Sequence, residues 1–263
     1  MKLTAITLCF AMVLGASAYN LLLLDDSSPD YGMPDDNNNL DSVEQVLTDM
    51  GISFDHWHNN WIMNKSADLR FLLDYDIILW YNDNRAILES EYQVMQKWVG
   101  EGNFLVVTGE DSLGSPNDPL MAELVGSAIY GDCPFCEQFT VTNPNNWVAD
   151  GEAGFYDGTY DIIAYASDHD MAEPKLPVTY AVAVTVTGDH GVGPAKILVT
   201  EVVPPLGGIV VYWNGNRDAA EWWRMSQTPV TVNMFKNMMN FLTDNVSGVA
   251  EVTWGSLKSV FAQ

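Results

Sequence analysis

The chain has 263 residues, of which 11 are basic and 35 acidic, and its formal net charge is −24. A surface this acidic repels phosphate groups, which excludes nucleic acids and anionic membranes as partners. The hydrophobic fraction of 48% excludes a disordered chain and is enough for one sizeable core.

Residues 1–18 have the features of a secretory signal peptide. Lys2 supplies the positive charge, residues 3–14 form a short apolar stretch, and residues 16–18 read Ala-Ser-Ala, a small-residue cleavage site. The stretch is too short to span a bilayer unaided, and no later apolar run reaches about 18 residues. We therefore expect a secreted protein, extracellular or periplasmic, without a membrane span. Cleavage before Tyr19 would remove Lys2 and leave a net charge of −25.

Strands and helices alternate between residues 19 and 126. Apolar runs predict buried strands at 19–26, 76–82 and 103–110, and a half-exposed strand at 52–58. Apolar residues at helical spacing predict helices over 39–51, 66–75, 88–102 and 117–126, the second of them capped by Ser66. This order predicts a three-layer α/β sandwich with a mainly parallel sheet and helices on both faces.

The rhythm changes in residues 128–206, which are rich in Gly, Pro, Asn and Asp. Alternating segments at 179–188 and 195–202 predict an antiparallel extension of the sheet. A strand at 207–216 and a helix over 232–245 then restore the first pattern. We expect residues 19–246 to form a single domain.

Residues 247–263 are expected to form a separate tail that begins at a chain break near Gly248. Trp254, Leu257, Val260 and Phe261 follow one another at spacings that place them on one side of a helix. Such a stripe favours a docking segment, through which the protein would self-associate or bind a protein partner. An added edge strand and a sorting signal are the alternatives.

Two cysteines, Cys133 and Cys136, remain after the signal peptide is removed. Thioredoxin-like Cys-x-x-Cys motifs need a preceding strand and a helix that begins at the first thiol. Here Gly and Asp precede the pair, and the strand-like segment 137–142 follows it. We therefore expect a small structural disulfide, as is common in oxidising compartments.

Polar residues follow most of the predicted parallel strands. Ligands of open α/β sheets bind beyond the carboxyl ends of the strands, although such ends are also polar simply because they meet water. The residues expected to bind a ligand at this edge are Asp25, Asp26, Asn82, Asp83, Glu110 and Asn214.

Two groups of side chains could hold a metal ion. The loop 25–41 is rich in Asp and Asn, so a Ca²⁺ ion near Asp25, Asp26 and Asp30 is one hypothesis, but the loop lacks EF-hand spacing, which favours a solvated, turn-rich loop. His56 and His58 lie on one side of the predicted second strand, as a metal-binding pair would. The interleaved Trp57 and Trp61 favour a surface aromatic cluster instead. No other cofactor is expected.

Four phrases of the sequence resemble the class I glutamine amidotransferase-like superfamily, in particular its ThuA-like branch. They are "LLLLDD" (21–26), "YDIILWYND" (75–83), "WVGEGNFLVVTGED" (98–111) and "GGIVVYWNGN" (207–216). The resemblance covers residues 19–126 and 207–245, and it implies a flavodoxin-like fold. Amidotransferases of the superfamily carry a Gly-x-Cys-x-Gly elbow after the strand that matches 103–110. Residues 109–114 read GEDSLG, without a cysteine, so a thiolate mechanism has no nucleophile here.

These observations favour a secreted, non-catalytic module that acts in ligand binding or extracellular assembly. One alternative is a metal-assisted hydrolase of carbohydrates or peptides. Its weak catalytic candidates are Asp26, Glu110, Asp111 and Ser112, and the aromatic residues of "YWNGN" (212–216) and "EWWRM" (221–225) would stack on sugars. The other alternative is a self-assembling structural subunit.

Overall fold

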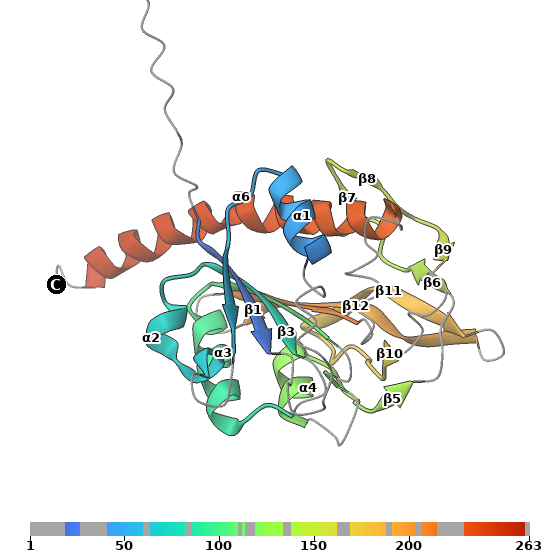
Figure 1. Cartoon of the computed structure of the whole chain (residues 1–263), viewed down its shortest axis with the longest axis horizontal. Helices are drawn as coiled ribbons and strands as arrows, with labels where there is room; N and C mark the ends of the chain where they lie inside the picture. The colour runs from blue at the N-terminus through green and yellow to red at the C-terminus, as the bar shows by residue number, and fades with distance from the viewer. Residues whose placement is uncertain are drawn as a thin grey trace, which may run out of the picture.

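A computed structural model of the chain describes residues 19–26, 41–59, 64–82, 86–109, 112–113, 119–133, 138–161, 169–187, 191–203, 207–214 and 229–260. Figure 1 shows a twisted central sheet with helices α1 and α6 on one face and α2, α3 and α4 on the other. The predicted three-layer α/β architecture is confirmed, and it is consistent with a flavodoxin-like fold.

The sheet has nine strands in the order β2-β1-β3-β4-β13-β12-β11-β6-β9. Its first five strands are parallel: β2 (Asp55–His58), β1 (Leu21–Asp26), β3 (Ile77–Asn82), β4 (Phe104–Thr108) and β13 (Gly208–Trp213). The chain goes from β1 outward to β2 and then returns to β3 on the other side of β1. This reversal creates the topological switch point at which open α/β sheets bind their ligands.

The second half of the sheet is antiparallel, as the alternating segments at 179–188 and 195–202 predict. It consists of β12 (Gly191–Val203), β11 (Thr179–Thr187), β6 (Gln138–Val141) and β9 (Thr159–Asp161). Two small sheets lie outside it: β5 (Asp132–Cys133) with β10 (His169–Asp170), and β7 (Asp150–Gly151) with β8 (Gly154–Phe155).

Each face of the sheet buries its own apolar cluster. Along β1, Leu21 and Leu23 belong to the cluster under α1 (Asp41–Asp49) and α6 (Pro229–Val260), whereas Leu22 and Leu24 belong to the opposite one. The opposite cluster packs under α2 (Leu69–Leu72), α3 (Glu89–Gly100) and α4 (Pro119–Val125). This partition follows from the two-residue period of a strand and fixes the face to which every side chain of the parallel half points.

The helix predicted over 66–75 is shorter than expected, and its predicted cap is wrong. A 3₁₀ turn, η2 (Lys65–Ala67), precedes α2, and Asp68 caps α2 by accepting a hydrogen bond from the backbone N–H of Phe71 at 3.2 Å. Ser66 is buried and donates instead to Glu91 Oε1 at 2.5 Å. The hydroxyl is drawn to a buried carboxylate, which is a stronger acceptor than water.

The closing helix is longer than predicted. α6 runs without interruption from Pro229 to Val260, so the expected chain break at Gly248 is wrong. Val246 is the last buried residue of α6 among the side chains that the structure describes, and Figure 1 shows the last turns of the helix projecting beyond the sheet. A separate role for residues 247–263 stays a prediction. Within the described ranges no helix is both long and apolar enough to cross a membrane, and the predicted signal peptide, 1–18, lies outside those ranges.

Candidate functional site

The carboxyl edge of the parallel half carries a row of polar side chains on the face of α1 and α6. The registers of the adjacent strands align His58 with Asp25, Asp25 with Tyr81, and Tyr81 with Thr108. The row therefore crosses β2, β1, β3 and β4 in order and passes over the switch point between β1 and β3. Thr108 is 2% exposed, and among the described residues its hydroxyl has no hydrogen-bond partner.

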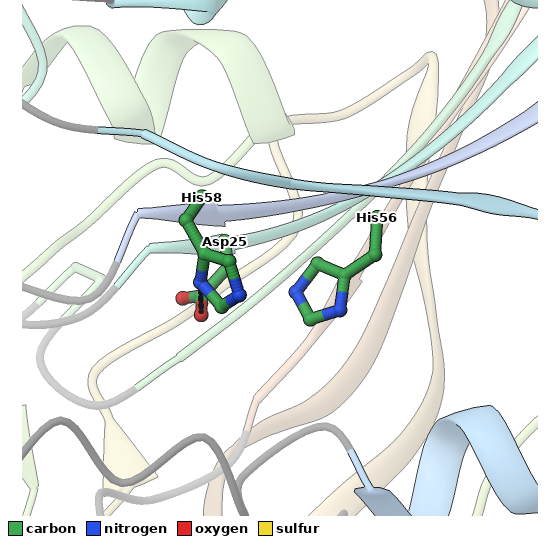
Figure 2. A group of neighbouring side chains, drawn as sticks. All are labelled: Asp25, His56 and His58. Atoms are coloured by element: carbon green, nitrogen blue, oxygen red, sulfur yellow. Dashed lines mark ion pairs between the residues drawn. The ribbon is translucent and has the colours of Figure 1, made fainter.

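At the β2 end of this row, Asp25, His56 and His58 form a compact cluster (Figure 2). Each residue offers one ligand atom, and these three atoms lie within 4.8 Å of one another. The His58 Nδ1 is 2.9 Å from Asp25 Oδ2, and the two imidazole rings lie 4.3 Å apart between centroids. The cluster opens to solvent on one side, since the side chain of His58 is 51% exposed and that of Asp25 is 10% exposed.

Helix α1 supplies the fourth residue of the site, Glu44. Its carboxylate Oε1 lies 2.6 Å from His56 Nδ1, so we assign a hydrogen to Nδ1; in the neutral ring Nε2 then carries the lone pair. In the described part of the chain His56 Nε2 is buried and has no hydrogen-bond partner. A buried polar atom left in this state costs about 1–3 kcal/mol, and His56 Nε2 shares this state with several other side-chain atoms of the described residues, among them Thr108 Oγ1.

Two imidazoles and one carboxylate are ligands that suit zinc and related transition metals, rather than the all-oxygen shell that calcium prefers. The alternation along β1 puts Asp25 and Asp26 on opposite faces of the sheet, so the two carboxylates do not converge. Asp30 lies outside the described residues, and calcium binding on that loop stays a prediction. Trp57 also points away from the histidines, toward Phe71 at 5.4 Å between ring centroids; Trp61 lies outside the described residues.

The turn after β4 has the position of a nucleophile elbow but a structural role. Gly109 has φ of +143°, and a Cβ there would lie 1.7 Å from the backbone oxygen of Asn82. Ser112 is fully buried and donates its hydroxyl hydrogen to that same oxygen at 2.7 Å. This hydrogen bond joins the turn to the end of β3. The hydroxyl of Ser112, a weak catalytic candidate in the sequence, is therefore already bonded to a backbone oxygen. Asp83, Glu110 and Asp111 lie outside the described residues.

Asn82 itself points to the face of α2, α3 and α4, where it is fully buried. In the described ranges neither its amide nitrogen nor its amide oxygen has a hydrogen-bond partner. Asn82 therefore meets one requirement of a ligand-binding residue, an unsatisfied side chain at the carboxyl edge.

Asn214, after β13, has a structural role instead. Its amide nitrogen donates to the backbone oxygens of Asp170 (2.8 Å) and Ala195 (2.9 Å), and its oxygen accepts from the Asp170 N–H at 3.0 Å. Asp170 in turn accepts from Tyr212 O–H (2.6 Å) and from the Leu113 N–H (2.8 Å). This buried network joins β10, β13 and the elbow turn.

The network was missed by sequence reasoning, because Asp170 lies in the irregular segment far from β13 in the chain. Lys196 adds a buried ammonium that donates to the Asn214 backbone oxygen. Tyr212 and Trp213 are buried in the two cores, so the sugar-stacking role suggested for this segment is wrong. The segment 221–225 lies outside the described residues.

Cys133 lies on β5, opposite His169 of β10. Cys136 lies outside the described residues, so the expected disulfide stays a prediction. The strand expected after the pair is confirmed as β6.

No protein-family model matches the sequence, and no curated protein matches it either. Solved structures do share the fold. A ThuA-like protein from Bacteroides uniformis aligns with a TM-score of 0.54 at 12% identity, over 85% of this chain and 92% of that one. A cytoplasmic protein from Salmonella typhimurium aligns with a TM-score of 0.57 at 11% identity, over 85% and 98% of the two chains. A second one, from strain LT2, aligns at 0.55 and 9% identity, over 85% and 99%.

These similarities establish the fold and leave the activity open, because all three identities are low. The Bacteroides uniformis neighbour is described as ThuA-like, which is the branch that the four sequence phrases resemble. Two of the three neighbours are described as cytoplasmic, which gives no support to export.

Proposed function

We propose that the protein is an exported binding module, without nucleophilic catalysis, whose ligand site is the carboxyl edge of β2, β1, β3 and β4. The observation that carries this proposal is that the side chains at this edge differ in their hydrogen bonding. The Ser112 hydroxyl donates a buried hydrogen bond to the Asn82 backbone oxygen, whereas His56 Nε2, Thr108 Oγ1 and the Asn82 amide, on three strands of the same edge, have no hydrogen-bond partner among the described residues.

A serine nucleophile needs a base within hydrogen-bond reach and an accessible Oγ. Ser112 is 0% exposed, and the acceptor of its hydrogen is a backbone oxygen, which cannot serve as a general base. Its neighbour Leu113 gives its N–H to Asp170. An oxyanion hole would need such a donor to be free.

Export and assembly are supported by the sequence. Residues 1–18 have signal-peptide organisation, and the stripe of Trp254, Leu257, Val260 and Phe261 suits docking on a protein partner or a second copy. The matching experiment is mass analysis of the secreted protein, which should begin at Tyr19. Retention of residues 1–18 in the mature protein would contradict export by this route.

The absence of nucleophilic catalysis is tested with Ser112→Ala. Wild type and variant are incubated with glutamine and with p-nitrophenyl acetate, and product is compared with a protein-free blank. We expect no turnover by either protein, together with a lower melting temperature for the variant because a buried hydrogen bond is lost. Hydrolysis by the wild type that a folded Ser112→Ala protein lacks would overturn the proposal.

A metal-assisted hydrolase is the second candidate, and the cluster of Asp25, His56 and His58 favours it. Catalytic zinc sites use three protein ligands and keep one position for water or substrate. Zinc-dependent cleavage of a peptide or glycoside substrate, lost in His58→Ala, would select this candidate over the binding module.

A further inference from the structure

We propose that Asp25, His56 and His58 bind a divalent transition-metal ion of the zinc class, and that Glu44 positions His56 for it. The inference rests on the proposed function only in placing the ligand at the carboxyl edge of the parallel strands. It names the ligand from the chemistry of the side chains in Figure 2.

The backbone brings the three ligands together without any special loop. His56 and His58 are two residues apart on an edge strand, so both point to the face of α1. The parallel register then sets Asp25 directly opposite His58. Because all three residues lie on strands of one sheet, the site is largely formed before any metal arrives.

The distances are those of a site that has yet to close around an ion. With metal–nitrogen bonds of about 2.0–2.1 Å, ligand atoms of a tetrahedral zinc lie about 3.3 Å apart. The three candidate atoms lie within 4.8 Å of one another, and His58 Nδ1 is 2.9 Å from Asp25 Oδ2. Binding of zinc would therefore require the more distant of these atoms to approach by up to about 1.5 Å, the difference between 4.8 Å and 3.3 Å.

The strongest single observation is the state of His56. Glu44 accepts a hydrogen bond from His56 Nδ1 at 2.6 Å, and this contact holds the ring with Nδ1 toward α1. Figure 2 shows a ring nitrogen of His56 pointing toward His58 and Asp25. In the described structure Nε2 is buried without a hydrogen-bond partner. A metal ion would supply that partner, and metal-binding histidines commonly hold their other nitrogen against a carboxylate in this way.

The ligand set decides the class of metal. Imidazole nitrogens favour Zn²⁺, Ni²⁺, Cu²⁺ and Fe²⁺, whereas Ca²⁺ and Mg²⁺ take oxygen ligands. Three protein ligands leave at least one coordination position for water or for a ligand molecule. Solvent reaches the cluster on the side of His58, whose side chain is 51% exposed.

The test is calorimetric titration of the metal-free mature protein, without a histidine tag, with Zn²⁺. A Cys133→Ser, Cys136→Ser background keeps thiolates out of the measurement. We expect one Zn²⁺ per chain, and a loss of affinity of at least about 100-fold in His56→Ala and in His58→Ala, more than an outer-shell change produces. His169→Ala, in the separate β5–β10 sheet, is the matched control and should bind as the background protein does.

Glu44 is tested as a positioning residue. Glu44→Ala should weaken zinc binding about 10- to 100-fold without changing the stoichiometry. Glu44→Gln should restore most of the affinity, because its amide oxygen can accept the same hydrogen bond from His56 Nδ1. Asp49→Asn is the control on the same helix, since Asp49 bonds Gln45 rather than the cluster.

X-ray absorption of the zinc-loaded background protein gives a readout that needs no substitution in the cluster. The spectrum should show imidazole ligands of zinc, two of them in the proposed site. A chain that binds no zinc, or that binds it equally well without His56 and His58, would overturn the metal site and leave the binding-module proposal intact. Ser112-dependent hydrolysis would do the reverse.

Discussion

Gly109 is the residue on which the elbow turn depends, and Gly109→Ala tests the structural reading of that turn. The φ of +143° lies in a region that only glycine adopts readily, and holding an alanine there costs about 1–3 kcal/mol. The new Cβ would also lie 1.7 Å from the Asn82 oxygen, where real contacts stay above 3.0 Å, so the end of β3 must shift. Such overpacking typically costs a further 1–3 kcal/mol or so.

Together these effects predict that Gly109→Ala lowers the free energy of unfolding by about 2–6 kcal/mol. Gly51→Ala is the matched control, because Gly51 also has a positive φ, of +73°, but has no atom within 4 Å of its would-be Cβ. It should cost only the left-handed strain of about 1–2 kcal/mol. Urea unfolding followed by circular dichroism measures both. Equal destabilisation by the two substitutions would refute the claim that the turn is pressed against β3.

Four other outcomes follow from the structure. Glu91→Ala leaves the donors of Asn64 and Leu88 without their acceptor, so it should destabilise by at least about 2–3 kcal/mol in urea unfolding, while Glu89→Ala, on the exposed side of α3, should change little. Burial, followed by the hydrogen bond to Asp55, raises the pKa of Tyr75 to about 12. The wild type should therefore have a larger free energy of unfolding than Tyr75→Phe below pH ~10, the ordinary pKa of tyrosine, and this difference should disappear as the pH rises from there to about 12. Intact-mass analysis with and without reductant should find the two cysteines of the CPFC segment oxidised, and two free thiols in fresh protein would refute the disulfide. Deletion of residues 248–263 should leave cooperative unfolding intact and change the elution volume in gel filtration, because it retains the buried core residues of α6 from Met234 to Val246; loss of folding would place the deleted residues in the core.

The parallel half of the fold could be predicted because its strands are recognisable from short stretches of sequence. "LLLL" before Asp25 and "IILW" before Tyr81 are buried on both faces, and such runs read as strands without knowledge of their neighbours. Helix ends were less predictable. Ser66 looked like a cap in sequence, yet the buried Glu91, 25 residues away, determined its role.

Three residues of the candidate site could be singled out from the sequence, but it could not be predicted that they lie together in one cluster. Asp25, His56 and His58 each stood out in the sequence, but as parts of two different metal hypotheses. The register of β1 against β2 unites them, and register depends on pairing between strands that the chain separates by a helix. Glu44 was not singled out, because a glutamate on the surface of a predicted helix looks like any solvated charge until its contact with His56 is known.

Anomalous diffraction at the zinc absorption edge, from crystals of the full mature chain grown with Zn²⁺, tests the central claim most directly. The account predicts one strong peak at the carboxyl edge of β1 and β2, bonded to His56 Nε2, a ring nitrogen of His58 and a carboxylate oxygen of Asp25. A crystal in which zinc occupies other residues, such as the cysteines near β5, and leaves this cluster without metal would contradict it.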